Sequence, residues 1–307
     1  MSSGVSPHDA TTPVEGGPLS AHGELARGTV VGRYEIVRVL GRGGMGAVYA
    51  GYDPQLDRQI ALKLLHPGSR IAPATLIGEA KALARLDDPH VVQIFDAGEH
   101  AGEVFIAMQL VHGEDLRSAL ARRHPKPPQI LGWFVAAGRG LAAAHAAGLV
   151  HRDFKPSNVL IDRRGRVGLA VNLHDPGATA KGFAGTPLYM APEQHALAAA
   201  SEASDQFAFC VALWEALFGR HPYVKHEEGS PALVGHQIAE AALVAPSRGH
   251  AVPRRVVDAL TRGLSRDPGA RWPNMNALLA QLVPQPRRRW PLLVLAGAAV
   301  DATGVAV

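Results

Sequence analysis

The first hundred or so residues alternate short apolar runs with turn residues. Runs that are rich in β-branched and aromatic side chains and bounded by glycine or polar clusters are typical of β-strands. Residues 72–86 differ, because their apolar side chains recur at helical spacing until Asp87 and Pro89 end the pattern. The expected strands are residues 34–40, 47–52, 59–65, 91–97 and 103–110. The chain therefore begins with a mostly antiparallel sheet and one helix.

After Gly113 the pattern becomes helical. Residues 130–147 are rich in alanine and apolar on all sides, as in a buried helix, and residues 204–219 are similar. Helical spacing recurs at residues 253–264 and 274–282. The pattern predicts an α+β fold of two lobes, with a small β-rich N-lobe followed by a larger, mainly α-helical C-lobe.

Composition adds limits to this picture. Apolar residues make up 47% of the 307 residues, which is ample for a core, and the net charge of +4 is modest. Three basic residues fall together at 287–289, so a distributed nucleic-acid surface is not indicated. Cys210 is the single cysteine and stands in an apolar stretch, which excludes a disulfide framework and fits a cytoplasmic setting.

The two ends of the chain differ from the rest. Residues 1–29 lack the apolar core of a secretory signal and are expected to be a disordered leader. A basic linker at 284–289 precedes an apolar tail at 290–307. As a helix the tail would span about 27 Å, just short of a hydrocarbon core of about 30 Å. Asp301 would cost roughly 2.5–3.5 kcal/mol near the bilayer centre, so a membrane anchor and an Ala/Gly-rich tail both stay open.

A glycine cluster follows the first predicted strand. Gly41, Gly43 and Gly46 fit GxGxxG, a pattern of dinucleotide sites and of kinase phosphate loops alike. Glycine is needed in such loops because a Cβ would block the approach of backbone amides to phosphates. A dinucleotide site requires a helix after the glycines, whereas residues 47–50 continue as a strand, with Val48 where the kinase pattern has valine. Alone, the cluster also fits a plain glycine-rich hairpin.

A charged residue interrupts the next apolar strand. Lys63 stands inside IALKLL, where an unpaired ammonium group would be costly to bury. It therefore needs anionic partners, unless it lies at a sheet edge and extends its amine into solvent.

The most specific pattern is HRDFKPSN at residues 151–158. With the glycine cluster and Lys63 before it in the right order, the chain resembles the bacterial, eukaryotic-like serine/threonine protein kinases over residues 34–282. The resemblance implies that Asp153 orients the substrate hydroxyl and accepts its proton, that Lys155 steadies the transferred phosphate, and that Asn158 binds Mg²⁺. It also implies that Lys63 binds phosphates and pairs with Glu79.

The resemblance further implies a kinase domain at 30–283, with the N-lobe at 30–111 and the C-lobe at 112–283, that binds ATP with Mg²⁺, or Mn²⁺ as an alternative metal. Its partners would be a protein substrate or a signalling partner, and no nucleic acid. Met108 would lie behind the adenine, and backbone groups of Gln109 and Val111 would bond to it. The remaining nucleotide-site residues of the N-lobe would be Leu40, Gly41, Arg42, Gly43, Gly44, Gly46, Val48, Ala61 and Lys63.

The segment GTPLYMAPEQ at 185–194 resembles the end of the family's activation segment. Two further residues resemble structural anchors of the family. Asp205 would brace the backbone of the catalytic loop, and Arg271 would pair with Glu193.

One motif departs from the family. Where kinases carry Asp-Phe-Gly, whose aspartate is the main Mg²⁺ ligand, this chain has Val171, Asn172 and Leu173. Mg²⁺ demands oxygen ligands, which valine does not supply, although Asn172 or Asp175 could substitute. Two hypotheses follow, an active but impaired protein kinase and a pseudokinase that binds nucleotide or acts as a scaffold.

Overall fold

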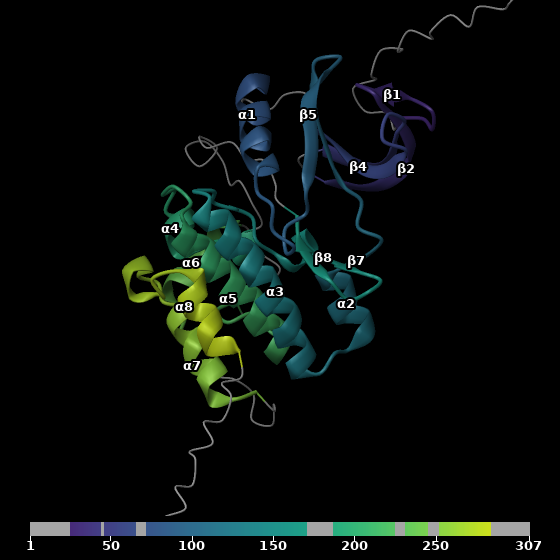
Figure 1. The fold of residues 1–307 in the computed structure, drawn as a ribbon. Coiled ribbons are helices and arrows are strands. Elements are labelled where there is room, and N and C mark those ends of the chain that lie inside the picture. Colours follow the sequence, from purple (N-terminus) through teal and green to yellow (C-terminus); the bar gives the residue numbers. More distant parts are fainter. Residues whose placement is uncertain are drawn as a thin grey trace, which may run out of the picture.

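The N-lobe is a single antiparallel sheet with one helix on it. The computed structural model describes residues 25–43, 46–65, 72–170, 187–224, 231–244 and 252–283. The sheet has the order β1-β2-β3-β4-β6-β5, and α1 (Pro73–Ala84) packs on β5 and β6. Its strands are β1 (Val30–Val31), β2 (Tyr34–Gly43), β3 (Gly46–Asp53), β4 (Arg58–Leu65), β5 (Ile94–His100) and β6 (Glu103–Gln109). Figure 1 shows this lobe above the helical one.

Both faces of the sheet are covered by apolar side chains. One cluster contains Tyr34, Ile60 and Phe105, and a second lies under α1 and contains Leu76 and Ile106. The alternation of strand side chains places one set on each face. Burial on both faces explains why β4 reads as a continuous apolar run rather than as an alternating one.

One predicted strand is shifted. Residues 91–97 were expected to form it, but β5 begins at Ile94, because Val91 and Val92 pair with the C-lobe instead. The Val92 N–H donates to the Leu169 carbonyl at 2.9 Å, and the Leu169 N–H donates to the His90 carbonyl at 2.7 Å. These backbone bonds join the two lobes beside the connecting segment.

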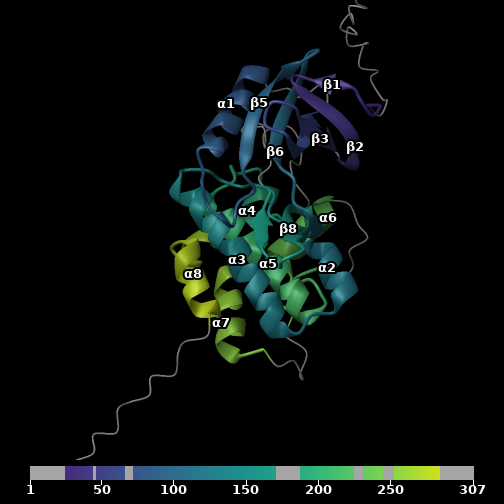
Figure 2. The ribbon, with the colours of Figure 1, turned by 45° about the vertical axis from the view of Figure 1, so that its right-hand side comes forward.

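The C-lobe is built around α5 (Glu202–Phe218), whose side chains are buried on nearly all sides. It contacts α3 (Pro127–Ala146) and α7 (Arg254–Gly263), and α8 (Met275–Leu282) packs against α3 and α7. Figure 2 shows these helices together below the sheet. The remaining elements are β7 (Gly113–Asp115), α2 (Leu116–Arg123), β8 (Val159–Asp162), β9 (Val167–Leu169), α4 (Pro192–His195) and α6 (Pro231–Glu240), with 3₁₀ turns at Pro156–Asn158, Pro187–Tyr189 and Pro268–Ala270.

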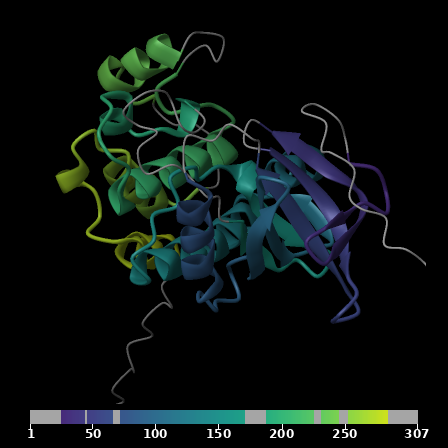
Figure 3. The same cartoon turned by 90° about the horizontal axis from the view of Figure 1, so that it is seen from above.

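The predicted α+β fold of a β-rich N-lobe and a helical C-lobe is confirmed, and Figure 3 shows from above how the sheet of the N-lobe overlaps part of the helical lobe. Within the described ranges, no helix is long and apolar enough to cross a bilayer. Residues 1–24 of the leader predicted at 1–29, Gly44, residues 171–173, the linker at 284–289 and the tail at 290–307 lie outside the described residues, so the predictions about them remain predictions. The last residues of the predicted leader are described, and the Gly28 N–H donates to the Ile36 carbonyl at 2.8 Å.

The fold makes a testable distinction between two glycines of α3. A Cβ at Gly140 would lie 2.5 Å from the backbone carbonyl oxygen of His90, whereas a Cβ at Gly132 would meet nothing within 4 Å. Gly140→Ala should therefore destabilise the protein by about 1–3 kcal/mol through overpacking. Gly132→Ala should be neutral or stabilise it by up to about 1 kcal/mol through helix propensity. Urea unfolding of the two variants measures the difference, and equal stabilities would contradict the α3 packing.

Candidate active site

The catalytic-loop segment 151–158 lies between α3 and β8 and is held from below by Asp205. This carboxylate is 1% exposed and accepts two backbone N–H groups, that of His151 at 2.7 Å and that of Arg152 at 2.8 Å. His145 donates a third bond from Nε2 at 2.8 Å, and the proton must be on that nitrogen because a carboxylate only accepts. The predicted bracing role of Asp205 is confirmed.

These bonds fix an unusual backbone shape. Arg152 has φ of +68°, a left-handed conformation that non-glycine residues seldom adopt. The surrounding structure maintains this conformation, because Asp205 of α5 binds the backbone N–H groups of His151 and Arg152. The side chain of Phe154 is buried against Phe209 of α5, with ring centroids 5.5 Å apart. Loop backbone and loop side chain are therefore both attached to the same central helix.

Two predicted catalytic residues and the predicted metal ligand meet in this loop. Asp153 is nearly buried, and the ammonium nitrogen of Lys155 lies 2.8 Å from its Oδ2. Nδ2 of Asn158 donates to the Asp153 carbonyl at 2.7 Å and to its Oδ2 at 3.2 Å. The amide nitrogen of Asn158 is thus occupied, which leaves its Oδ1 as the atom that could bind a metal. The carboxylate of Asp153 and the amine of Lys155 therefore lie side by side.

Lys63 approaches this group from the N-lobe. It stands in β4 with 8% of its surface exposed. Burial lowers the pKa of its ammonium group to about 8, while the negative charge of Asp153 raises it and the positive charge of Lys155 lowers it. Lys63 therefore lies close enough to the catalytic loop for the charges of Asp153 and Lys155 to shift its pKa, although it is far from them in sequence.

Glu79 of α1 contacts a different residue from the one the resemblance implied. Its Oε1 lies 3.4 Å from Nη1 of Arg152, and both side chains are partly buried. This ion pair connects the helix of the N-lobe to the catalytic loop of the C-lobe. The contact between Glu79 and Lys63 stays a prediction.

The glycine loop joins β2 and β3. Gly41 pairs with Val48, and Val48 pairs with Lys63 on the next strand. At Gly46, φ is +145° and a Cβ would lie 1.9 Å from the Leu64 carbonyl oxygen, so only glycine fits. Leu40, Gly41, Arg42 and Gly43 are exposed at the tip, where they would face a bound phosphate group.

The segment that connects the lobes follows β6. Ala61 is buried and pairs with Met108 across β4 and β6. The Gln109 N–H donates to the Gln93 carbonyl at 2.8 Å, so this N–H is not available to adenine. The contact predicted for Gln109 therefore falls to its carbonyl oxygen, and the donor must come from Val111.

The described residues fit a metal only in part. They contain no group of three or more His, Cys, Asp or Glu side chains that could hold an ion. Asn158 Oδ1 is one neutral oxygen ligand, whereas Mg²⁺ favours near-octahedral oxygen coordination with carboxylates. The second expected ligand position, Val171, offers no oxygen in its side chain.

The loop before α4 is held by residues that the sequence did not single out. His221 is 2% exposed, and its Nδ1 accepts the backbone N–H groups of Tyr223 and Val224 at 3.1 and 2.9 Å. Its Nε2 therefore carries the proton and donates to the Leu188 carbonyl at 2.7 Å. Tyr189 donates its hydroxyl to Glu215 of α5 at 2.8 Å.

His195 adds a second imidazole contact at this loop, with Nε2 3.1 Å from the Pro187 carbonyl oxygen. An apolar sequence context could have signalled the buried His145, but nothing local marks His195 or His221.

The predicted pair of Glu193 and Arg271 is confirmed as two parallel bonds of 2.7 Å. This bidentate geometry is typical of strong arginine–carboxylate pairs.

Comparison with known proteins agrees with this geometry. A family model described as "Protein kinase domain" matches residues 34–283. The serine/threonine-protein kinase PknD of Mycobacterium tuberculosis is 33% identical over 255 residues, which cover 80% of this chain and 38% of that protein. PknE, from the same organism, is 34% identical over 267 residues, covering 84% of this chain and 47% of that protein. This chain spans less than half the length of these two relatives.

A solved structure supports the same conclusion at the level of shape. The crystal structure of the Mycobacterium tuberculosis PknI kinase domain aligns with a TM-score of 0.62 and 27% identity, covering 84% of this chain and 98% of that one. Two lobes, a glycine loop, a buried lysine and a braced HRD loop define a protein-kinase-type phosphotransfer site. The chain belongs to the protein kinase family.

The site predicts a dependence of stability on pH. Burial lowers the pKa of His221 from 6.5 to about 4, although the bond to Leu188 opposes the shift. The folded protein thus binds this proton less readily than the unfolded chain, so stability present above pH 6.5 is lost as the pH falls toward 4. The loss should reach about 2 kcal/mol at pH 5.

Urea unfolding at pH 7 and pH 5 measures this loss. The variant His221→Gln lacks the titrating group, so its unfolding free energy should fall by about 2 kcal/mol less over the same interval. Parallel behaviour of the two proteins would show that His221 is not buried in its neutral form.

Proposed function

We propose that this chain is a protein serine/threonine kinase that transfers the γ-phosphate of ATP to hydroxyl groups of a protein substrate. The observation that supports it most is the geometry of the catalytic loop, where Lys155 Nζ lies 2.8 Å from the Asp153 carboxylate and Asn158 holds the Asp153 backbone at 2.7 Å. We also propose that the domain acts in the cytoplasm, with anchoring through residues 290–307 as a separate prediction.

In the proposed reaction, each residue acts on a stated atom. The Asp153 carboxylate would accept the proton of the substrate hydroxyl as its oxygen bonds to the γ-phosphorus. The bond from that phosphorus to its bridging oxygen breaks, and ADP leaves. Lys155 and Lys63 would stabilise the charge on the phosphate oxygens. The glycine loop from Gly41 to Gly46 would position the phosphates through backbone amides.

Mg²⁺ or Mn²⁺, when bound, would neutralise phosphate charge, and Asn158 Oδ1 is the described atom that would hold it. Because Val171 supplies no ligand, the remaining affinity for metal should be low. The second candidate function, a pseudokinase that binds nucleotide or serves as a scaffold without transferring phosphate, is favoured by this substitution alone. The two functions differ in turnover rather than in fold.

The first test removes the proposed base. Purified protein is incubated with radiolabelled ATP, Mg²⁺ or Mn²⁺ and a generic protein substrate, beside Asp153→Asn. Label transfer should fall by roughly 10²–10⁴-fold in the variant, because the amide cannot accept the proton. Melting temperatures of both proteins control for folding. Equal label transfer by the two proteins would contradict the kinase function, and a melting temperature raised by ATP would then support the pseudokinase.

The second test restores the missing carboxylate. Val171→Asp should lower the metal concentration for half-maximal phosphate transfer by about tenfold or more, since about 1.4 kcal/mol of added metal binding gives a factor of ten. Val171→Asn is the matched control, because it has the same shape as aspartate without its charge. If both variants require as much metal as the parent chain, residue 171 does not face the metal.

A further inference from the structure

A cavity of about 720 Å³ lies beside the segment that connects the lobes. Its walls come from residues 87–89 and 91–93 after α1, from residues 109–112, and from the β8–β9 turn with the start of β9. Among the described residues predicted to hold nucleotide, Gln109 and Val111 alone line it. The cavity therefore meets the predicted adenine site at one wall and is otherwise separate from it, and its size is that of a small-molecule site.

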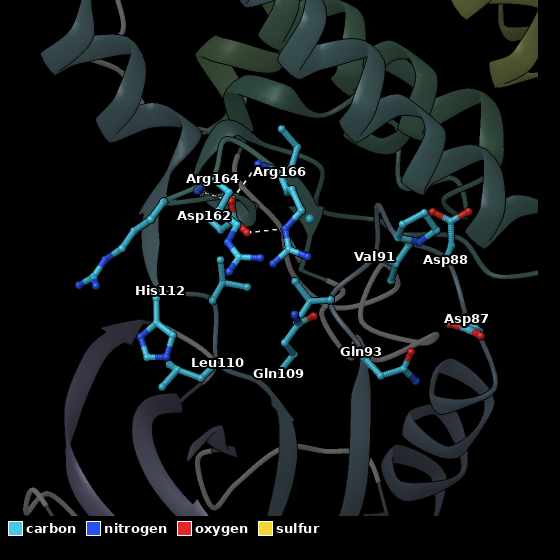
Figure 4. A pocket seen from close by; sticks show the side chains of 16 residues that line it. Asp87, Asp88, Val91, Gln93, Gln109, Leu110, His112, Asp162, Arg164 and Arg166 are labelled. Atoms are coloured by element: carbon cyan, nitrogen blue, oxygen red, sulfur yellow. Dashed lines mark hydrogen bonds and ion pairs between the residues drawn. The ribbon is translucent and has the colours of Figure 1, made fainter. Parts of the chain in front are cut away.

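Opposite charges line opposite sides of this cavity. Figure 4 shows Arg164 and Arg166 reaching inward from the β8–β9 turn, with Asp87 and Asp88 on the far side and Gln93 nearer to the aspartates. The described residues offer the side chain of Arg164 no acidic partner. A dipolar ligand would complement both walls, whereas an anion alone would meet charge of its own sign on the side of the aspartates.

Asp162 fixes the backbone of the turn that carries the two arginines, whose side chains are exposed. Asp162 accepts the backbone N–H groups of Arg164 at 2.8 Å and Arg166 at 2.9 Å, and its Oδ2 lies 2.6 Å from Arg166 Nε. These three bonds lower the pKa of Asp162 despite its partial burial and keep it ionised within the turn. The turn backbone and Arg166 are thus held before any ligand arrives, which reduces the entropy that this part of the site loses on binding, whereas the exposed side chain of Arg164 would be ordered by the ligand.

We propose that this cavity, termed the rear pocket, binds a small molecule that carries a phosphate or carboxylate group at one end and an amine at the other. The guanidinium groups of Arg164 and Arg166 bind the anionic group, since their planar forks match both phosphate and carboxylate. Asp87 binds the amine. The side-chain amide of Gln109 and the Oε1 of Gln93 contact the middle of the ligand, because Nε2 of Gln93 already donates to the Ala84 and Ile94 carbonyls at 3.1 and 3.2 Å. This site does not depend on the proposed function.

The rear pocket is connected to the active site through backbone bonds. Its wall continues along β9 to Ala170, whose N–H donates to the Asn158 carbonyl at 2.8 Å and whose carbonyl lies 3.1 Å from His151 Nε2. Its other wall is the segment predicted to contact adenine. A ligand that bridges these walls should therefore change the affinity for adenosine, and adenosine should change that of the ligand by the same factor.

The test titrates the full chain with phosphoethanolamine, with β-alanine as the carboxylate counterpart and with inorganic phosphate as the half-ligand, at 150 mM salt and without metal. Ligand-observed NMR gives the dissociation constants. Phosphoethanolamine or β-alanine should bind at least tenfold more tightly than inorganic phosphate. The stronger of the two identifies which anionic group the pocket takes. Binding of neither above the phosphate level overturns the proposal.

Variants locate the site. The double variant Arg164→Gln, Arg166→Gln should weaken the dipolar probe at least tenfold, and Asp87→Asn should reduce it to the level of inorganic phosphate. Arg139→Gln is the matched control, because Arg139 is an exposed arginine of α3 outside the cavity. Lys63→Met tests whether the probe binds at the predicted nucleotide site instead. Binding there would be weakened by Lys63→Met and not by the arginine double variant. Unchanged affinity in the arginine double variant overturns the proposal.

The coupling is read from adenosine affinity with and without saturating probe. A change in the parent chain that disappears in the arginine double variant supports communication through the connecting segment. An unchanged adenosine affinity, with the probe bound, overturns the coupling while leaving the binding site in place.

Discussion

The active site depends on a single buried carboxylate. Isolated burial of the Asp205 charge would be strongly unfavourable, but two backbone N–H groups and His145 bond to it. In return, these bonds hold the left-handed backbone of Arg152, which no local preference of arginine would select. The position of Asp153 relative to Lys155 and Asn158 follows from that backbone. Asp205, which is buried in the C-lobe, thus determines how the side chains of the catalytic loop are arranged.

Much of this could be predicted from the sequence, because the relevant signals are local. The strand around Lys63 and the spacing within HRDFKPSN depend only on neighbouring residues, and both were found where expected. The predicted strand at 91–97 was wrong at its start because His90 and Val92 bond to Leu169 of β9, far along the chain. Apolar spacing cannot show which strand a residue pairs with. The bond from His221 to the Leu188 carbonyl could not be predicted either, because the two residues are far apart in sequence.

Two neighbouring findings concern how charge is balanced in the proposed site. Glu79 lies against Arg152, so in this arrangement a carboxylate of α1 offsets the positive charge of the catalytic loop. Burial lowers the pKa of Lys63 to about 8, although the negative charge of Asp153 opposes the shift. Bound phosphates would further favour the protonated form, so nucleotide binding would be coupled to the charge of Lys63.

Val171 stands where the kinase resemblance predicts the metal-binding aspartate, and this would separate binding from transfer. The glycine loop, Lys63 and Lys155, which the resemblance assigns to the phosphates, are present, whereas the predicted metal ligand is valine. Nucleotide binding needs only the first set, but transfer also needs the transition-state charge to be neutralised. If metal is weakly held, Lys63 and Lys155 must supply more of that neutralisation. Retained binding with reduced turnover is thus the expected effect of this substitution, and any group that repositions β9 would act on the same balance, since β9 leads directly to residue 171.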